Sequence, residues 1–281
     1  MKKLLYFFTF AFSLLIVFSC EPARDQNGDL LFGVDGAGGT GGGGTPPSGR
    51  LLTKMESHAI DLETGEMSDE TLTFQYEGTK LVSTTDQDGN VTLITYNSNN
   101  RISKLTSAGQ TATLEYSGSN VSKLTSDITG LLKTTSTFTY SGSKLTKVAT
   151  IHEFTFPIPM KSYIEGNYTY SGSNIVKTII KTGIYNFDGQ LEMSPDDQVY
   201  DISFDDKKSP YKLLPSEYLS YMFGMGPHGA FLQSANNHLQ LKISATGTPA
   251  ETTNYTHIYD SEGYPMKTTS SADEYIIYTY K

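Results

Sequence analysis

The sequence has 281 residues, a formal net charge of −9 and an aromatic content of 12%. This length suits one large domain or two small ones, and the aromatic content is too high for a disordered chain. The negative charge argues against a nucleic-acid partner, because phosphate binding depends on a cluster of Lys and Arg that the sequence lacks. The sequence contains only one long apolar run, which argues against a protein with several membrane-spanning helices.

The N-terminus has the pattern of an export signal. Lys2 and Lys3 precede an apolar run over residues 4–19, which ends at the only cysteine, Cys20. A charged start, a short apolar centre and a small residue before the cleavage point are typical of a secretory signal peptide. We therefore expect residues 1–19 to be removed, which leaves 19 basic and 30 acidic residues and a net charge of 19 − 30 = −11.

The end of this run, Val17-Phe18-Ser19-Cys20, resembles the lipobox of bacterial lipoproteins. The resemblance implies that Cys20 is diacylated and becomes the first residue of the mature chain. Phe18 departs from the pattern, because lipoproteins usually have a smaller residue there. The alternative is a secreted protein whose cysteine is incidental. In either case a single cysteine excludes a disulfide within the chain.

Residues 20–50 form a predicted flexible tether after the acylated cysteine. Ten glycines lie between Gly28 and Gly49, and the segment has too little apolar surface to compensate for the entropy of ordering it. Thirty such residues have an r.m.s. reach of about 30 Å. A glycine-rich phosphate loop would need a preceding buried strand and a following helix, and the sequence predicts neither here.

Residues 51–281 have the pattern of an all-β domain. Short segments place large residues at every second position with Thr, Gln or Lys between them, which is the periodicity of strands with one buried face. Helical periodicity is almost absent before residue 210. The predicted strands include Leu72–Tyr76, Phe138–Tyr140, Tyr168–Tyr170, Tyr200–Phe204, Leu239–Ile243 and Ile276–Tyr280.

An internal repeat is the most informative feature of this domain. Each unit reads tyrosine, small polar turn, Asn or basic residue, aliphatic residue, and the starting tyrosines are 20, 20, 24 and 30 residues apart. This spacing predicts one β-hairpin per unit, and therefore an antiparallel meander of ten or more strands that forms a barrel-like or strongly curved sheet. The units are Tyr76–Leu81, Tyr96–Ile102, Tyr116–Val121, Tyr140–Leu145 and Tyr170–Ile175, with a looser copy at Tyr259–Tyr264.

The alternating pattern breaks between Asp205 and Asn237. The run from Leu213 to Leu232 gathers Leu, Tyr, Met and Phe without a period of two, which predicts a small, partly helical cap over the apolar sheet face, from about residue 210 to 237. Aromatic residues with glycine hinges can line the mouth of a barrel; the alternative is that they fill the core. The candidates for a ligand or cap surface are Tyr211, Tyr218, Tyr221, Phe223, His228 and Phe231.

Other polar motifs do not predict a catalytic or metal site. Residues 86–90 resemble the start of a calcium loop, but the later ligands are missing and a hairpin turn selects the same residues. Asp196, Asp197, Asp201, Asp205 and Asp206 could hold a cation, although a solvated strand edge is the favoured interpretation. The five histidines lack zinc-ligand spacing, and no Gly-x-Ser-x-Gly motif is present. We predict no enzyme activity, no cofactor and no metal.

The tyrosine units, followed by Phe204–Tyr211 and then Ser234–Asn237, resemble a family of Bacteroidetes-type envelope lipoproteins with a domain of unknown function. The resemblance covers roughly residues 60–281 and implies a porin-like, antiparallel barrel without catalytic residues that could be transferred. The units are also similar to the tyrosine-aspartate repeats of Rhs and teneurin-like shells. Among these units, however, Asp follows Tyr only at Tyr259-Asp260, which argues against a toxin-encapsulating shell.

Together these features predict a non-enzymatic, lipid-anchored protein of the bacterial cell envelope. It would be held at the outer membrane, periplasmic or surface-exposed, as a binding or structural module whose partner is an envelope protein or a glycan. Polar outward strand faces argue against a membrane-spanning barrel, because lipid demands an apolar band. The alternative is a soluble β-barrel that carries a small apolar ligand, which would require an open cavity of several hundred Å³. An enzyme of unrecognised type comes third and would require a cleft of perturbed ionisable groups.

Overall fold

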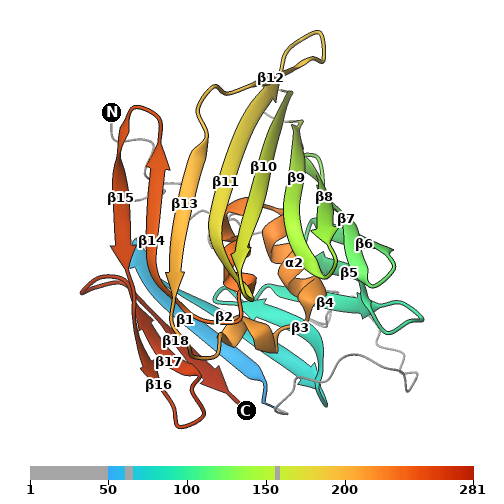
Figure 1. Cartoon of the computed structure of the whole chain (residues 1–281). Coiled ribbons are helices and arrows are strands. Elements are labelled where there is room, and N and C mark those ends of the chain that lie inside the picture. Colours follow the sequence, from blue (N-terminus) through green and yellow to red (C-terminus); the bar gives the residue numbers. More distant parts are fainter. Residues whose placement is uncertain (1–49, 61–65, 156–158) are drawn as a thin grey trace.

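The chain forms one antiparallel sheet of 18 strands that curls into a nearly closed barrel (Figure 1). This structure is a computed structural model that describes residues 50–60, 66–155 and 159–281. It confirms the predicted all-β antiparallel meander and its barrel-like curvature. The predicted signal peptide, Cys20 and the tether up to residue 49 lie outside the described residues.

The strands account for most of the described chain. They are β1 (Leu52–Ile60), β2 (Met67–Glu77), β3 (Lys80–Asp86), β4 (Val91–Tyr96), β5 (Ile102–Ser107), β6 (Gln110–Ser117), β7 (Asn120–Ile128), β8 (Leu132–Ser141), β9 (Lys144–Phe154), β10 (Met160–Ser171), β11 (Asn174–Tyr185), β12 (Leu191–Met193), β13 (Gln198–Phe204), β14 (His238–Ala245), β15 (Thr248–Asn254), β16 (Thr256–Tyr259), β17 (Pro265–Thr269) and β18 (Tyr275–Tyr280).

The order of strands in the sheet follows the chain. From β2 to β11 each strand pairs with its successor, and β11 then pairs with both β12 and β13. Strand β1 pairs with β2 and with β18, so the first and last strands lie side by side. Among the described strands, β15 and β16 are each paired on one side only, with β14 and β17 respectively. The barrel wall is therefore open between these two edges.

Each tyrosine unit contains the same local distortion. The pairing register shifts immediately before Tyr76, Tyr116 and Tyr140, which marks a β-bulge at the tyrosine. The turn that follows contains a residue with positive φ, such as Gly118 at 60°, a conformation that glycine adopts without steric cost. The aliphatic residues that close the units are 0–4% exposed and lie in the core: Leu81, Ile102, Val121, Leu145 and Ile175.

The tyrosine hydroxyls connect neighbouring strands along one rim of the barrel. Tyr76 donates a hydrogen bond to the carbonyl oxygen of Leu52 at 2.9 Å, and Tyr96 donates to that of Leu81 at 2.8 Å. Basic side chains cover the rings: the Lys80 Nζ atom lies 3.9 Å from the ring centroid of Tyr96. Such cation–π contacts add to the packing of the rim. We call the row of rings formed by Tyr76, Tyr96 and Tyr116 the tyrosine ladder.

Strand β8 shows how the alternation of residues builds the core. Leu132 and Phe138 point inward and are buried, whereas Lys133 and Thr137 point outward and are exposed. The same period of two continues on the neighbouring strands, because side chains alternate between the two faces of a sheet. The inward face carries hydroxyl groups as well as apolar side chains: Thr84, Ser126, Thr134, Ser136, Thr150 and Thr178 are 0–3% exposed.

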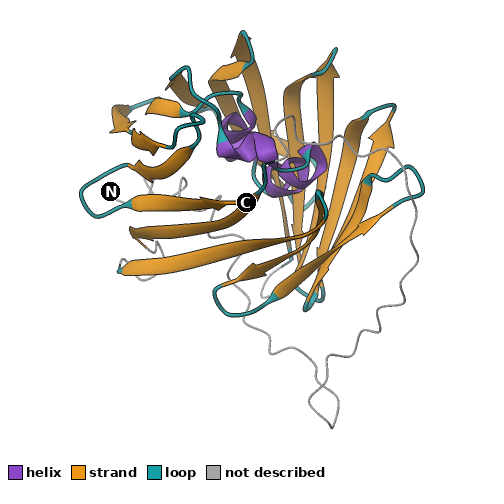
Figure 2. Cartoon of the chain, turned by 90° about the horizontal axis from the view of Figure 1, so that it is seen from below, coloured by secondary structure: helices purple, strands orange, loops and turns teal. Residues whose placement is uncertain are grey.

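Three short helices fill the space enclosed by the sheet. They are η2 (Pro210–Leu213), α2 (Ser216–Gly224) and η3 (Pro227–Gln233), all from the segment that interrupts the strand pattern. Viewed from below, the helices lie in the middle with strands on the surrounding sides (Figure 2). We refer to residues 205–237 as the cap; this range includes the segment predicted as a cap at about 210–237, and its helices lie within the barrel.

Candidate functional site

The cap is held at both ends by one group of polar contacts. The backbone nitrogen of Asn237 donates to Asp205 Oδ1 at 3.0 Å, and the backbone nitrogen of Asp205 donates to the carbonyl oxygen of Asn237 at 2.9 Å. The Asn237 amide also donates to the carbonyl oxygen of Lys208 at 3.2 Å, and the Tyr259 hydroxyl donates to Asp205. The two polar motifs singled out in the sequence, around Asp205 and Asn237, thus meet in space and close the cap into a loop.

The centre of the cap comes into close contact with the sheet at Gly224. A Cβ atom at this position would overlap the Leu124 side chain and lie 3.2 Å from Phe138. The carbonyl oxygen of Gly224 accepts hydrogen bonds from the hydroxyls of Ser136 and Thr150, the latter at 3.2 Å. The inward hydroxyl groups of β8 and β9 therefore bind the C-terminal end of helix α2, where carbonyl groups lack helical partners.

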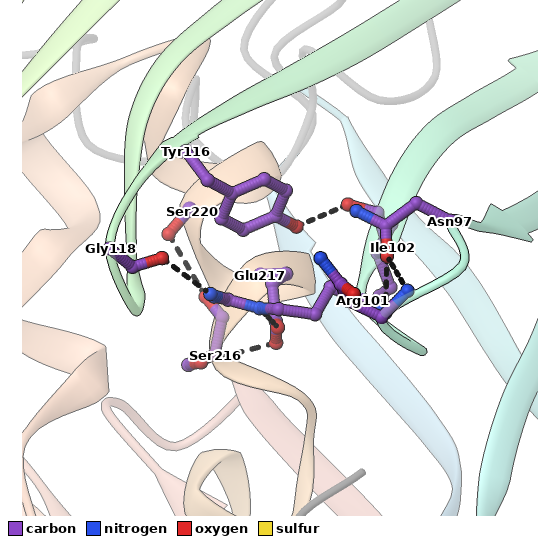
Figure 3. Close-up of polar contacts among 9 residues, drawn as sticks. Asn97, Arg101, Ile102, Tyr116, Gly118, Ser216, Glu217 and Ser220 are labelled. Atoms are coloured by element: carbon purple, nitrogen blue, oxygen red, sulfur yellow. Dashed lines mark hydrogen bonds and ion pairs between the residues drawn. The ribbon is translucent and has the colours of Figure 1, made fainter. Parts of the chain in front are cut away.

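A partly buried ion pair links helix α2 to the tyrosine ladder (Figure 3). Arg101 Nε donates to Glu217 Oε1 at 3.0 Å, and the two side chains are 21% and 15% exposed. The Arg101 guanidinium carbon lies 4.0 Å from the ring centroid of Tyr116, and its Nη1 donates to the carbonyl oxygen of Gly118 at 3.4 Å. Glu217 lies in the first turn of α2, where the helix dipole favours a negative charge.

Sequence reasoning missed this ion pair. The signal that could have revealed it is that Glu217 is the only charged residue between Leu213 and Leu232. A charge within an otherwise apolar insertion requires a partner if the segment is buried. The partner itself was not predictable, because Arg101 lies 116 residues away in the chain.

The six candidate residues of the cap are all buried, with exposed fractions of 1–6%, and they pack as core. His228 contacts the ring of Tyr200 edge-on, and Tyr211 contacts Tyr278 in the same way. Their position therefore agrees with the alternative interpretation of this segment, in which the aromatic residues fill the core. The individual fractions are Tyr211 4%, Tyr218 1%, Tyr221 3%, Phe223 3%, His228 6% and Phe231 3%.

Four of these residues also line small cavities beside the cap. Tyr218 and Tyr221 line a cavity of about 40 Å³ next to strands β2, β3 and β4. Tyr211 and Phe231 line a cavity of about 10 Å³ near His238. Both volumes are far below the about 300 Å³ at which sites for drug-sized ligands begin. Within the described part of the chain, the cap packs into the core of the barrel, and neither of these two cavities could hold a drug-sized ligand.

One histidine, His228, is buried, and two, His152 and His238, are partly buried; the loss of contact with water lowers the pKa values of all three below the usual 6.5. The pKa falls to about 4 for His152 and His228, and to about 3 for His238, where the nearby His257 lowers it further. All three are therefore neutral at neutral pH. Among the described residues, no three His, Cys, Asp or Glu side chains are close enough to hold a metal ion.

The acidic residues do not converge on a common point. Asp201 and Asp197 form ion pairs with Lys177 and Lys181 of β11, at 3.5 Å and 3.3 Å. Asp86 accepts hydrogen bonds from the backbone nitrogens of the β3–β4 turn, and Gly89 in that turn has a φ of 81°. The residues that resemble a calcium loop thus form a hairpin turn.

The comparison with one solved structure supports the fold. A porin-like protein from Bacteroides vulgatus is 9% identical, has a TM-score of 0.55 and matches over 82% of this chain and 98% of its own. A porin-like protein from Bacteroides uniformis is 14% identical, has a TM-score of 0.49 and matches over 85% and 99% of the two chains. At these identities the likeness concerns the barrel fold alone.

No protein-family model and no curated protein matches the chain. No helix in the described ranges is long and apolar enough to cross a membrane. The porin-like architecture implied by the sequence resemblance is confirmed by the barrel itself and by the structure from Bacteroides vulgatus. Lipidation of Cys20 remains a prediction, because this residue lies outside the described part of the chain.

Proposed function

We propose that this chain is a non-enzymatic, lipid-anchored protein of the outer membrane that acts as a rigid binding or structural module. The observation that carries this proposal is the filled barrel interior: the six candidate residues of the cap are 1–6% exposed, and the larger of the two cavities beside them holds about 40 Å³. A barrel filled in this way presents its outer surface and its hairpins to a partner. An envelope protein or a glycan is the proposed partner class.

The outer surface suits contact with water and with polar partners. Outward side chains on the central strands form cross-strand ion pairs, such as Lys123 with Glu115 at 2.8 Å and Lys147 with Glu165 at 3.3 Å. Thr137 lies between such pairs on the outward face of β8. Lipid-facing strands instead carry a continuous apolar band. This polarity supports a domain that is held at a membrane by its acyl chain.

The filled interior disfavours the alternative of an apolar-ligand carrier. A carrier needs an enclosed volume of about 300 Å³ or more that is lined by apolar groups. The larger cavity here is much smaller, and it is lined by Glu70 and Asp86 as well as by aromatic residues. The carrier function would therefore require the whole cap to leave the barrel.

Anchoring can be tested by labelling living bacteria with an alkyne-bearing fatty acid. The wild-type chain should incorporate the label and fractionate with the outer membrane. The Cys20→Ala variant should lose the label, because the thiol that receives the acyl chain is absent. Equal labelling of both chains, or no labelling of either, would contradict lipid anchoring at Cys20.

Partner binding can be tested with a photo-crosslinking amino acid at two adjacent positions of β8. Thr137 points outward and is exposed, whereas Phe138 points inward and is 5% exposed. The outward position should give a defined crosslinked species in intact cells, and the inward position should give none. Absence of crosslinks at outward positions, together with a stoichiometric apolar compound in organic extracts of the purified protein, would instead identify a carrier.

A further inference from the structure

The β11–β12 hairpin and the adjoining start of β10 carry a cluster of exposed apolar side chains. The turn of the hairpin projects beyond the neighbouring strands at one end of the barrel (Figure 1). Phe187 lies in this turn and is fully exposed. Apolar groups gathered in this way mark a contact with another protein or with a membrane. The large apolar side chains at this rim that are at least 38% exposed are Met160, Ile184, Phe187, Leu191 and Met193.

These side chains lie on both faces of the hairpin. Antiparallel pairing places Ile184 opposite Glu192 on one face, and Tyr185 opposite Leu191 on the other. A rigid protein partner would have to enclose the hairpin from two sides to cover all of them. The fluid boundary between headgroups and acyl chains surrounds a projecting tip without needing a matching pocket. The arrangement therefore favours a lipid surface over a protein.

The outward side chains of β11 follow the change in polarity across the surface of a bilayer. Away from the tip, Lys181 pairs with Asp197 at 3.3 Å. Tyr185 comes next toward the tip, with the Lys161 Nζ atom 4.8 Å from its ring centroid, and Phe187 follows in the turn. Tyrosine is enriched at the level of the headgroups, and lysine side chains extend from that level into water. The order of ion pair, tyrosine and phenylalanine thus matches the passage from water to acyl chains.

The polar groups of the turn are paired within the hairpin. Asn186 Oδ1 accepts hydrogen bonds from the backbone nitrogens of Asp188 at 3.0 Å and of Gln190 at 2.9 Å. The backbone nitrogen of Gly189 donates to the carbonyl oxygen of Asn186 at 2.9 Å, and the Asn186 amide donates to Glu192 at 2.8 Å. Unpaired polar groups are costly in an apolar medium, so this pairing lowers the cost of moving the turn out of water.

The charges near the tip select the kind of lipid. Asp188 and Glu192 are exposed, whereas the nearby Lys161 is paired with Glu153 at 2.9 Å. Carboxylates repel anionic headgroups and attract the ammonium group of a zwitterionic headgroup. The charge of the hairpin therefore favours a zwitterionic bilayer.

We propose that the β11–β12 hairpin, with the start of β10, inserts its tip into the headgroup region of a zwitterionic bilayer. Phe187 enters deepest, and Tyr185 lies at the level of the headgroups. The contact involves one rim only, so the polar outer wall of the barrel remains in water. This inference goes beyond the proposed function and does not require acylation of Cys20.

The contact is also compatible with an anchor at Cys20. Leu51 exchanges backbone hydrogen bonds with Lys281, and the C-terminus lies at the opposite end of the barrel from β12 (Figure 1). An extended chain spans about 3.3 Å per residue, so the tether of residues 20–49 can reach about 100 Å. The twelve residues of β11 span only about 40 Å. The tether is therefore long enough for the tip to touch the membrane that holds the anchor.

Tryptophan fluorescence of the full chain tests the inference. The sequence contains no tryptophan, so Phe187→Trp places a single reporter at the tip. With phosphatidylcholine vesicles its emission should shift to shorter wavelength, and brominated acyl chains should quench it about twofold. Ser119→Trp is the control, because it lies in the exposed β6–β7 turn at the opposite rim and should show neither effect. Both readouts are local, so they do not depend on how the chain is brought to the vesicle.

A second substitution in the Phe187→Trp chain tests the role of the apolar surface. Leu191→Ser should reduce the quenching about twofold or more, because it removes apolar area from the hairpin. Leu239→Ser is the matched control: Leu239 is 39% exposed and Leu191 38%, but Leu239 lies at the start of β14, away from the hairpin. Thermal unfolding confirms that each variant folds.

Three results would overturn the inference. The first is equal emission of the reporters at positions 187 and 119 in the presence of vesicles. The second is quenching at position 187 that requires anionic phosphatidylglycerol. The third is a photo-crosslink from position 187 to a protein in intact cells without quenching by vesicles, which would assign the hairpin to a protein partner.

Discussion

Gly224 and Gly166 lie where the cap comes closest to the sheet. A Cβ atom on Gly166 would be 2.7 Å from the hydroxyl oxygen of Tyr168 and 2.9 Å from the Cβ atom of Pro227. Neither glycine needs a positive φ, so their role is steric. They allow the backbones of the cap and of the strands to approach more closely than any other residue would permit.

Gly224→Ala should therefore destabilise the fold by about 1–3 kcal/mol, the usual effect of overpacking a core. The added methyl group would overlap Leu124. Gly226→Ala is the matched control, because the nearest atom to a Cβ there is 4.0 Å away, in His228. Urea denaturation of the two variants measures the difference. Equal stability of both variants would contradict the close approach at Gly224.

Strand β11 contains a buried residue, Thr178, whose replacement should not destabilise the fold. Its side chain is 0% exposed, and its hydroxyl has no hydrogen-bond partner among the described residues. Replacing an unpaired buried hydroxyl by a methyl group of similar shape loses no hydrogen bond, so Thr178→Val should be neutral or stabilising. Thr150→Val should instead cost about 1–3 kcal/mol, because Thr150 donates to Gly224. The midpoint of urea denaturation distinguishes the two; destabilisation by Thr178→Val would imply a partner for this hydroxyl.

At the scale of elements, the cap and the tyrosine ladder are joined by the pair of Arg101 and Glu217. Removing one partner leaves a charge in a site that is only about one-fifth exposed. Because that remaining exposure screens the charge, we expect Arg101→Gln or Glu217→Gln to destabilise the protein by about 1–3 kcal/mol. The double variant should cost less than the sum of the single ones, because the pair acts together.

The pair of Lys123 and Glu115 on the outer face is the control for this cycle. Its side chains are 42% and 61% exposed, and such surface pairs contribute less than about 1 kcal/mol. A coupling energy for Arg101 and Glu217 no larger than that of the control, measured by denaturation of all four combinations, would show that the cap is held by its apolar contacts alone.

The elements differed in how far the sequence could predict them. The hairpins were predictable because their signals are local: a turn glycine such as Gly118 and an aliphatic residue such as Val121 stand at fixed distances from Tyr116. The position of the cap inside the barrel was not, because it depends on contacts between Gly224 and strands about 74 to 88 residues away. The candidate residue Tyr221 was identifiable as aromatic, but its ring contact with Tyr218 inside the barrel was not.

At the scale of the whole molecule, the sheet and its filling depend on each other. The barrel closes through the pairing of β1 with β18, and it remains open between β15 and β16. An open sheet of this size has two unprotected edges and one apolar face that must be covered. The cap covers that face from inside the barrel. The core that the cap and the sheet share contains residues from both ends of the described chain. We therefore expect the described domain to unfold in one cooperative transition.

The histidines with lowered pKa values, His228 and His238, make that transition sensitive to acid. The pKa of His238 is about 3 and that of His228 about 4 in the folded protein, because burial favours the neutral form, whereas both are near 6.5 in the unfolded chain. Above pH 6.5 both histidines are neutral in the folded and unfolded states, so they do not lower the free energy of unfolding. Below pH 6.5 the unfolded state binds protons that the folded state does not. The free energy of unfolding then falls by about 1.4 kcal/mol per pH unit for each histidine.

His238→Phe should reduce this acid sensitivity. The ring of His238 is packed edge-on against Tyr255 at 4.2 Å and against Phe231 at 5.3 Å, so a phenyl ring fits the same contacts. Between pH 7.5 and pH 5.5 the variant should lose about 1.4 kcal/mol less free energy of unfolding than the wild type, since only the last pH unit lies below 6.5. Urea denaturation at the two pH values measures the loss, and an equal loss in both proteins would mean that His238 is protonated within the fold.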